Sequence, residues 1–515
     1  MVVAAVRWMS ACVAIGAAAP LLAGCAVGPD FRAPAAPEIT RYTREPLALR
    51  TSSAAVSGGA AQRFEFGRDV PQQWWKLFKS PALDRLIEQA LQRNPTVQSA
   101  LASLRAAKQA VYAQEGKFFP LVQANFNPTY QQTSAAVSPV PSSGVSVFEL
   151  DTAQLQVSYT FDVWGLNRRT VEQLTAMADT QRFQTEAAYL TLISNIVVAA
   201  ITEASLNAQI DTTNQLIQIN TSMVDTLKRQ FDKGAVTRGD LAVQEAALAQ
   251  VKATLPPLRK ALAQQRDLIT ALSGGFPSEG QQPTFRLTDF HLPANLPVSL
   301  PSQLIEQRPD VRAAEEQLHA ASAQIGIATA NMLPNFTMNA NVGYMSTTIA
   351  NLLAPQNLFF NLAGNVTHTV FDAGTLFHLR EEAKDNYQAA AWTYRNTVLI
   401  AVQNVSDSLR AVQNDADALK AAHEFERAAN ISFDQARRQF QEGSVNVLLL
   451  ATAQQGHLQA SIQVVQARAA RLADTAALFQ ALGGGWWNRA EPYQAQIVDV
   501  STGETHSIAE PPQTH

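Results

Sequence analysis

The chain has 515 residues, of which 47% are apolar, and this proportion is sufficient for a sizeable hydrophobic core. Only 16% of the residues are charged and the formal net charge is −4. These values exclude a basic protein that binds nucleic acid through phosphate contacts, and they exclude a highly charged disordered chain. The length is typical of three ordinary domains or of one large elongated domain.

The first 24 residues are typical of an export signal. Arg7 supplies a positive charge, and the apolar, Ala-rich stretch Trp8–Leu22 follows it. The stretch ends in Leu22-Ala23-Gly24-Cys25, which is similar to the bacterial lipoprotein box, where cleavage precedes an acylated cysteine. We therefore predict residues 1–24 as a signal peptide and Cys25 as a lipidation site. An ordinary signal peptide with a chance cysteine is the alternative.

Neighbouring residues restrict where the mature chain goes and what chemistry it carries. In bacterial lipoproteins an Asp after the cysteine would favour retention in the inner membrane, so Ala26 favours the outer membrane. The other cysteine, Cys12, lies in the signal, which excludes a disulfide or a cysteine nucleophile in the mature chain. No run of 18 apolar residues follows Leu22, so we expect no transmembrane helix and predict that any membrane-spanning part is a β-barrel.

The rest of the sequence contains a long internal repeat. The matched landmarks are Asn94-Pro95-Thr96-Val97 with Arg308-Pro309-Asp310-Val311, Phe119-Pro120 with Leu333-Pro334, Phe161-Asp162 with Phe371-Asp372, Phe231 and Gly234 with Phe440 and Gly443, and Ala271-Leu272 with Ala481-Leu482. The first pair is 214 residues apart and the last pair 210. A period this long excludes a solenoid and indicates a duplicated half-molecule.

The repeat divides the mature chain into five parts. Residues 25–80 are predicted to be a lipidated, extended segment, which the family resemblance described below extends to the start of an equatorial region, and residues 81–275 form the first repeat. A Pro-rich linker at 276–301 leads to the second repeat at 302–485. The tail at 486–515 is predicted to be irregular, with disorder in its last dozen residues.

Each half carries the same predicted elements in the same order. A helical pattern comes first and is followed by two segments in which apolar and polar residues alternate, which indicates strands with one apolar face. We predict strands at about 121–137 and 145–163 in the first half, and at about 335–347 and 357–372 in the second.

A very long stretch without Gly or Pro follows the second strand of each half. The two stretches are Leu166–Lys233 and Thr375–Glu442. At 1.5 Å per residue, each predicts a helix of about 100 Å. Gly234 and Gly443 are placed to end these helices, and a return helix is predicted after each turn.

Four predicted strands per chain are too few to close a barrel. Single-chain barrels begin at about eight strands, and an eight-strand barrel is filled by its own side chains. Open sheet edges are not tolerated in lipid, so several chains must combine. Two chains supply eight strands, whereas three supply twelve, the first number expected to leave an aqueous lumen. The predicted long helices would then continue the tube into the periplasm.

Three groups of residues resemble TolC/NodT-type outer-membrane efflux lipoproteins. The first group, Val27-Gly28-Pro29-Asp30-Phe31 with Pro34, directly follows the predicted lipid site. The second runs from Trp74-Trp75 and Phe78 through Pro81 to Asn94-Pro95, and the third from Leu296-Pro297 through Arg308-Pro309-Asp310-Val311 to Glu315. The resemblance covers essentially the whole mature chain.

This resemblance implies an α+β fold built as a homotrimer. Each chain would supply four strands to a 12-strand transmembrane β-barrel, with a long periplasmic α-helical barrel and a mixed equatorial domain. The resemblance also implies a lipid-anchored channel in the bacterial outer membrane that spans the periplasm. Its partners would be a periplasmic adaptor protein and an inner-membrane transporter, commonly a proton-driven one. The cargo would be drugs, other organic compounds or metals, and no cofactor is implied besides the lipid on Cys25.

In that family the turns after the long helices form the periplasmic tip, where the adaptor docks. The matching residues are Gly234, Val236, Thr237, Asp240, Gly443, Val445 and Asn446. Thr237 or Asp240, and Asn446 in the second half, are suited to cap the helix that follows. The two valines are expected as exposed apolar side chains, which suit a docking surface. A plain helical hairpin without a docking role is the alternative.

The family narrows its pore just above the tip. Its second-half motif runs from Gly to a Leu five residues on, an acid nine residues on, and then Ala-Gln. Here the run is Gly443, Leu448, Thr452 and Ala453-Gln454, so the leucine matches and Thr452 replaces the acid. The resemblance therefore implies a constriction at Leu448 and Thr452 without the carboxylate ring that would block cations. The first-half acid, Asp240, is present, and helix capping is its alternative role.

Residue patterns for catalysis and metal binding are weak in this sequence. None of the eight histidines shows close ligand spacing, and no nucleophile elbow or phosphate loop is recognisable, so we expect no enzyme and no metal site. Two other functions stay open. The outer channel of a type I protein-secretion system has the same fold, although the lipid box favours efflux. A periplasmic coiled-coil adaptor without a barrel would not need the four alternating segments.

The lipidation hypothesis predicts that Cys25→Ser abolishes acylation. A single lipid chain gives only marginal membrane binding, and the barrel would be the main anchor, so we expect reduced assembly rather than release from the membrane. Incorporation of labelled palmitate and membrane fractionation measure both effects. A wild-type chain that never takes up the label would show that Cys25 is not acylated.

Overall fold

The computed structural model describes residues 26–132, 147–278, 283–489, 497–498 and 505–506. Cys25 and the predicted signal peptide lie outside the described residues. The chain forms two compact units. The first, which we call the sheet unit, comprises residues up to Pro34, Leu104–Gln181 and Ala314–Tyr394. The second, which we call the helical unit, comprises Ala35–Ser103, Arg182–Ala313 and the residues from Arg395 onward.

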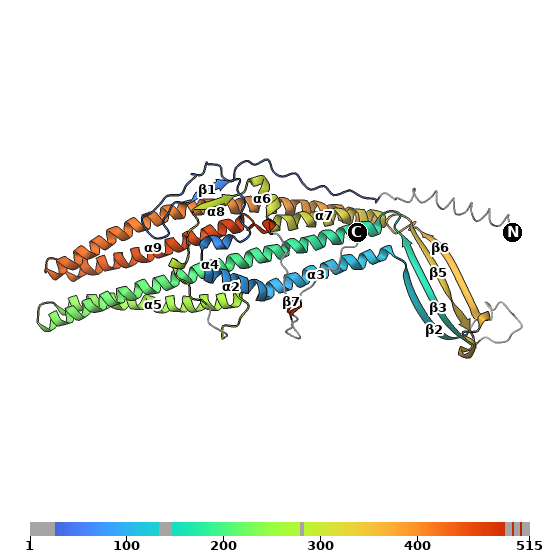
Figure 1. The fold of residues 1–515 in the computed structure, drawn as a ribbon, viewed down its shortest axis with the longest axis horizontal. Helices are drawn as coiled ribbons and strands as arrows, with labels where there is room; N and C mark the ends of the chain where they lie inside the picture. The colour runs from blue at the N-terminus through green and yellow to red at the C-terminus, as the bar shows by residue number, and fades with distance from the viewer. Residues whose placement is uncertain (1–25, 133–146, 279–282, 490–496, 499–504, 507–515) are drawn as a thin grey trace. The chain divides into compact units, whose positions relative to one another are not determined.

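The sheet unit contains a four-stranded antiparallel sheet. Its strands are β2 (Leu121–Gln132), β3 (Val147–Phe161), β5 (Asn335–Ser346) and β6 (Leu358–Thr367), and they lie in the order β2-β3-β5-β6 (Figure 1). Within the described part of the chain, β2 and β6 are therefore the edges of this sheet. The part of the first predicted strand beyond Gln132 lies outside the described residues.

Two aspartates set where strands end and long helices begin. The backbone N–H groups of Asn167 and Arg168 donate to the Asp162 carboxylate over 2.8 and 3.0 Å, so β3 ends at Phe161. In the same way, Gly374 and Leu376 donate to the Asp372 carboxylate over 2.9 and 2.8 Å. The fourth strand was expected to continue to about 372 but ends at Thr367. Asp372 caps the helix that follows and lies beyond the end of the strand.

The register gives the sheet two different faces. One row across all four strands joins Val122, Val157, Ala340 and Leu362, and these apolar residues share one face. The next residue along each strand lies on the other face, which carries Asn, Gln, Ser and Thr. Leu362 is 70% exposed, so the apolar face is uncovered in a single chain. An uncovered apolar face of this size marks a surface that meets lipid or another chain.

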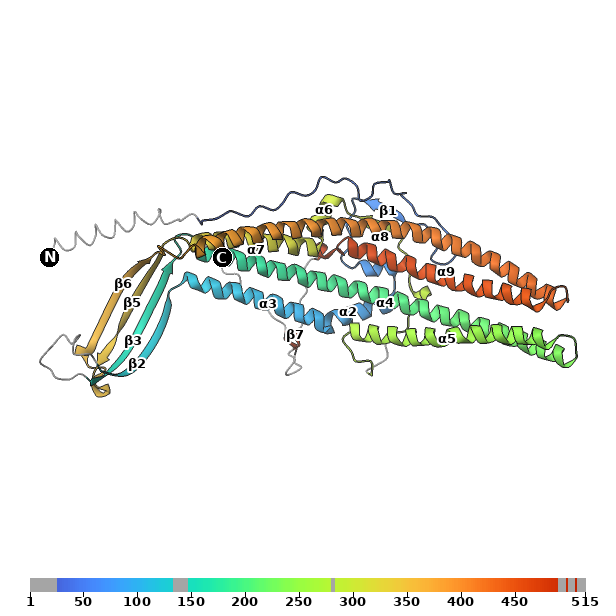
Figure 2. The same cartoon turned by 180° about the vertical axis from the view of Figure 1, so that it is seen from behind.

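The helices follow the predicted repeat. In chain order the helices and short elements are β1 (Arg63–Phe66), η2 (Trp74–Phe78), α2 (Pro81–Arg93), α3 (Pro95–Glu115), η3 (Gly116–Phe118), α4 (Leu166–Asp232), α5 (Arg238–Leu272), η4 (Leu287–Asp289), β4 (Asn295–Val298), α6 (Pro301–Gln307), α7 (Pro309–Ala330), η5 (Ile349–Asn351), η6 (Pro355–Asn357), α8 (Thr375–Gln441), α9 (Val447–Ala481), η7 (Trp486–Asn488), β7 (Ile497–Val498) and β8 (Thr505–His506). Figure 2 shows α4 beside α5 and α8 beside α9. The α+β class predicted from the sequence is confirmed.

The long helices of the two halves correspond at an offset of 209 residues. Helices α4 and α8 each contain 67 residues, and α5 and α9 each contain 35. The C-cap of α5 is Ser273 and that of α9 is Leu482. The pairing of Ala271-Leu272 with Ala481-Leu482 was therefore wrong by one residue. The sequence match followed side-chain identity, whereas the helix ends are set by backbone hydrogen bonds.

The Asn-Pro and Arg-Pro landmarks cap the ends of the return helices. Asn94 Nδ2 donates to the carbonyl oxygen of Leu272 over 2.9 Å, and Arg308 Nη1 donates to that of Ala481 over 2.9 Å. The last carbonyls of a helix lack partners within the helix, so each side chain satisfies one of them. The two different residue types therefore have the same structural role in the two halves.

The glycines after these helices leave room for that contact. Gly274 has φ of +81°, and a Cβ there would lie 2.6 Å from the carbonyl oxygen of Arg93. Gly483 has φ of +89°, and its Cβ would lie 2.7 Å from the carbonyl oxygen of Gln307. A side chain at either position would push away the segment that carries the capping residue.

Helix α4 is apolar enough to cross a membrane when judged by length and composition alone. It contains an 18-residue window of mean hydropathy 1.6, and 61% of this window is buried inside the structure. The window contains Thr, Ser and Asn, so it is not a continuous run of 18 apolar residues and does not contradict the expectation from the sequence. Ile196, Val197 and Ile201 are at most 1% exposed, so core packing accounts for much of the apolar character.

An extended segment near the N-terminus contacts helix α9 through a buried cation, Arg471. Arg471 is 1% exposed and donates to the carbonyl oxygens of Gly58 and Ala60 over 3.0 and 2.7 Å, and to Thr51 Oγ1 over 3.0 Å. Removing a buried, hydrogen-bonded charge of this kind would leave several acceptors unpaired. Arg471 therefore fixes the predicted extended segment in place.

A pair of carboxyl groups lies beside this cation, one on α8 and one on α9. Burial, the hydrogen bond to Asp474 and the charge of Asp474 together raise the pKa of the Asp415 carboxyl to about 7, whereas the charge of Arg471 opposes the shift. Two carboxyl groups that share a proton attract, whereas two carboxylates repel. The contact between α8 and α9 at this level is therefore sensitive to pH.

The raised pKa of Asp415 predicts that stability falls as the pH rises from about 4 to 7. The folded chain keeps a proton that the unfolded chain releases above the ordinary carboxyl pKa of 3.8, so this stabilisation is complete below that value and is lost as the pH passes through about 7. We expect the melting temperature of Asp415→Asn in detergent to depend less on pH than that of the wild type. Asp417→Asn, an exposed position on the same helix, is the matched control. Equal pH dependence of Asp415→Asn and wild type would contradict the assignment.

Candidate functional site

The two turns that join the long helices have the same backbone. Gly234 has φ of +71° and Gly443 has φ of +73°. After each helix, the N–H of the residue following the glycine donates back to the helix, from Ala235 to Gln230 over 2.9 Å and from Ser444 to Gln439 over 2.8 Å. This pattern ends a helix in the left-handed region, where only glycine is free of strain. Gly234 and Gly443 thus hold the turn geometry.

Capping side chains start the helix after each turn. Asp240 N–H donates to Thr237 Oγ1 over 3.2 Å, and the Thr237 N–H and hydroxyl donate to the Asp240 carboxylate over 3.0 and 2.7 Å. The hydrogen bonds from the Thr237 hydroxyl and from the Thr237 backbone N–H both lower the pKa of the Asp240 carboxyl. In the second turn, Leu449 N–H donates to Asn446 Oδ1 over 3.0 Å. The structure therefore gives Asp240 a capping role, the alternative considered from the sequence.

A cluster of apolar side chains joins the two turns within the helical unit. We call it the tip cluster; its buried members are Met223, Val224, Leu227, Leu241, Phe433, Ala436, Val447 and Leu450. Val236 packs against this cluster and is half-buried, and Val445 is also half-buried. The expectation that both valines are exposed was wrong, because the turns fold back onto their own helices. The exposed apolar side chains beside the second turn are Leu448 at 61% and Leu449 at 48%.

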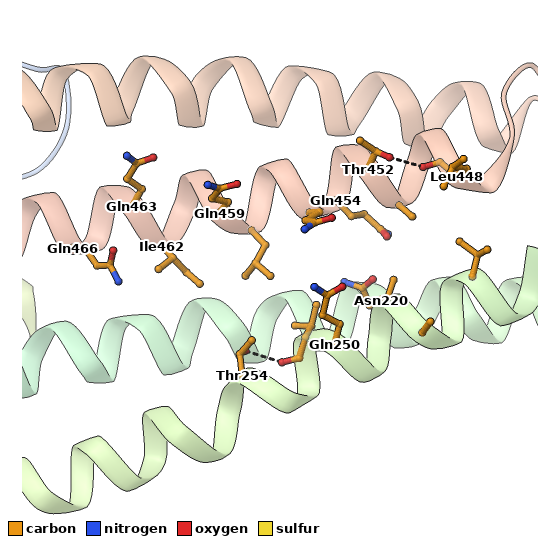
Figure 3. Close-up of a pocket in the computed structure, with 17 residues that line it drawn as sticks. Asn220, Gln250, Thr254, Leu448, Thr452, Gln454, Gln459, Ile462, Gln463 and Gln466 are labelled. Atoms are coloured by element: carbon orange, nitrogen blue, oxygen red, sulfur yellow. Dashed lines mark hydrogen bonds between the residues drawn. The ribbon is translucent and has the colours of Figure 1, made fainter.

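Leu448 and Thr452 lie one turn apart on the same side of α9 and line a groove between α5 and α9. Thr452 Oγ1 donates to the carbonyl oxygen of Leu448 over 2.9 Å, so the hydroxyl is turned back along its own helix (Figure 3). The groove has a volume of about 710 Å³, and all 17 residues that line it are uncharged. Besides Leu448 and Thr452, its walls carry glutamines from both helices, such as Gln250 and Gln459.

Three buried amide side chains are linked by hydrogen bonds beside this groove. Gln244 Nε2 donates to Asn220 Oδ1 over 3.0 Å and to Gln454 Oε1 over 3.1 Å, and the three residues are 0%, 2% and 5% exposed. They come from α5, α4 and α9, so this link fixes α9 relative to the first pair of helices. This link was not predicted from the sequence, although Gln454 belongs to the Ala453-Gln454 motif.

The residues at these turns suit contact with another protein and passage of a solute. Among the residues that the structure describes, no three His, Cys, Asp or Glu side chains lie close enough together to hold a metal ion. The one carboxylate in the predicted set, Asp240, is used in a capping box. What remains is a pair of rigid turns, two exposed leucines and an uncharged groove, which suit contact and passage.

Comparison with known proteins places this geometry among membrane channels. A family model described as "Outer membrane efflux protein" matches residues 86–275 and 300–484. The antibiotic efflux pump outer membrane protein ArpC of Pseudomonas putida is 26% identical over 486 residues, which cover 94% of this chain and 97% of that protein. The toluene efflux pump outer membrane protein TtgC, also of Pseudomonas putida, shows the same identity and coverage.

The fold is also similar to that of a solved channel. The CmeC outer membrane channel of Campylobacter jejuni superposes with a TM-score of 0.80 at 19% identity, and the match covers 90% of this chain and 95% of that one. The four-stranded sheet and the paired long helices are therefore a shared architecture.

Proposed function

The chain belongs to the outer membrane efflux protein family and is an outer-membrane efflux channel, and from that premise we propose that three copies close one duct that carries small molecules from the periplasm to the exterior. The observation that carries the proposal is the four-stranded sheet. One of its faces is apolar and uncovered, and the other carries amides and hydroxyls. This is the pattern of a transmembrane barrel that faces lipid outside and water inside.

The two edge strands support the number of copies. Lipid does not tolerate unpaired backbone groups, so β2 and β6 need partners from neighbouring chains. Three chains give twelve strands, which leave an aqueous lumen, whereas two give a barrel filled by its own side chains. The homotrimer with a 12-strand barrel follows from this count.

The long helices support a duct that continues beyond the membrane. At 1.5 Å per residue, the 67 residues of α4 and of α8 make helices of about 100 Å, several times the thickness of a hydrocarbon core of about 30 Å. A helical barrel of this length spans the periplasm. The lipid on Cys25 adds a second anchor to that of the barrel.

The turns are the proposed contact with the rest of an exporter. Their rigid backbones, built on Gly234 and Gly443 and capped by Thr237, Asp240 and Asn446, present fixed surfaces to a periplasmic adaptor protein. An inner-membrane transporter, proton-driven in our proposal, would supply the cargo. The similar proteins ArpC and TtgC are named for antibiotic and toluene efflux, which favours small organic compounds over secreted proteins as cargo.

The proposal predicts a trimer that conducts ions and that protects cells from toxic organic compounds. Crosslinking and native mass measurement of the detergent-extracted protein should give three chains. A deletion strain should become sensitive to organic antibiotics or solvents, because the periplasmic exit would be missing. A stable monomer that conducts ions in a planar bilayer would contradict the strand count, and unchanged sensitivity to all compounds tested would contradict efflux.

The replacement of the expected acid by Thr452 predicts a neutral constriction. Three Leu448 side chains would form an apolar ring, with three Thr452 hydroxyls one turn further along. Thr452→Asp should create a carboxylate ring and make single-channel current sensitive to multivalent cations. Leu448→Ala should widen the closed state and raise conductance. Asp240→Asn is the control, since the Asp240 carboxylate is engaged in the cap. If Asp240→Asn alters cation block and Thr452→Asp does not, the constriction is misassigned.

A further inference from the structure

One level of the sheet carries an amide on every strand. The register pairs Gln123 with Gln156, Gln156 with Asn341, and Asn341 with Asn361. These four residues, which we call the amide row, cross β2, β3, β5 and β6 in one line. They come from both halves of the repeat.

The amide row lies on the polar face of the sheet. Each of its members neighbours a member of the apolar row that contains Val157 and Ala340, and successive side chains along a strand point to opposite faces. Gln123 and Asn361 on the edge strands are exposed, and Gln156 and Asn341 are half-buried. The row is therefore accessible from the polar side.

The amides of the row are only partly used within the described part of the chain. Asn125 Nδ2 donates to Gln156 Oε1 at 3.5 Å, the outer limit of a hydrogen bond. Asn341 Oδ1 is buried and has no hydrogen-bond partner among the described residues. Amide groups carry two donors and one acceptor, so the row offers both kinds of partner to a passing molecule.

We propose that the amide row lines the lumen of the duct as a charge-neutral belt past which cargo moves. This inference rests on the proposed trimeric duct. Strands in a barrel tilt by about 35–45°, so three chains would give three inclined rows with twelve amides in all. Such a belt offers hydrogen bonds to the polar groups of uncharged and zwitterionic organic solutes, and it holds neither sign of charge. At this level the duct therefore selects by hydrogen bonding and size, and lets small ions of both signs pass.

Reversal potentials in planar bilayers under a KCl gradient test this proposal. The wild-type permeability ratio of K⁺ to Cl⁻ is the reference, because the neutral amides of the row themselves favour neither ion. Asn341→Asp adds three carboxylates per trimer and should raise the ratio at least about threefold, and Asn341→Lys should lower it by a similar factor. Glu149→Gln is the matched control: it removes a carboxylate from the opposite face of β3, opposite Tyr130, and should leave the ratio unchanged.

Gln123→Glu and Gln123→Lys, at the exposed edge-strand end of the row, repeat the test if the Asn341 variants fail to assemble. A conducting trimer whose ion preference responds to neither position would place the row away from the ion path and overturn the proposal. Absence of conductance or of trimers in the wild type would instead contradict the proposed function, so the two failures are distinguishable.

Discussion

The backbone hydrogen bonds at the edges of the sheet are the constraint on which the rest of the structure depends. A chain with four strands and an uncovered apolar face cannot satisfy β2 and β6 alone in lipid. The polar face also needs water, and only a closed barrel with a lumen provides it. The proposed oligomer and its aqueous duct both follow from this one requirement.

The duplicated design meets that requirement with one plan used twice. Each half supplies two strands, one long helix and one return helix, and the corresponding helices have equal lengths. The halves differ where local chemistry allows it. Asn94 and Arg308 cap the return helices through different groups, and Thr237 and Asn446 start them with different caps. Shared backbone geometry and divergent side chains are what a folded repeat requires.

Most of the fold could be predicted from the sequence because it rests on local patterns. Alternation indicated the strands, the absence of Gly and Pro indicated the long helices, and Gly234 and Gly443 indicated their ends. The errors arose where the position of a residue is set by its contacts with other residues and not by the local sequence pattern. The fourth strand was predicted to reach Asp372, but this residue caps the helix that follows. Val236 was predicted to be exposed, but it packs against the tip cluster.

The candidate site was only partly predictable for the same reason. The run from Gly443 to Thr452 placed two residues that do line one groove. The link from Gln244 to Gln454 joins residues 210 positions apart, and the carboxyl pair of Asp415 and Asp474 joins two helices. No local spacing indicates such contacts. Docking at the turns and the lipid on Cys25 stay predictions.

The contacts of Arg471 also determine when the chain can fold. Its partners Thr51, Gly58 and Ala60 lie 411 to 420 residues earlier in the sequence. Closing so large a loop requires helix α9, which is among the last elements to leave the ribosome and to cross the inner membrane. The early segment therefore gains these contacts only after helix α9 has been delivered. Biogenesis of this channel thus depends on holding a long, incomplete chain soluble until its C-terminal helix arrives.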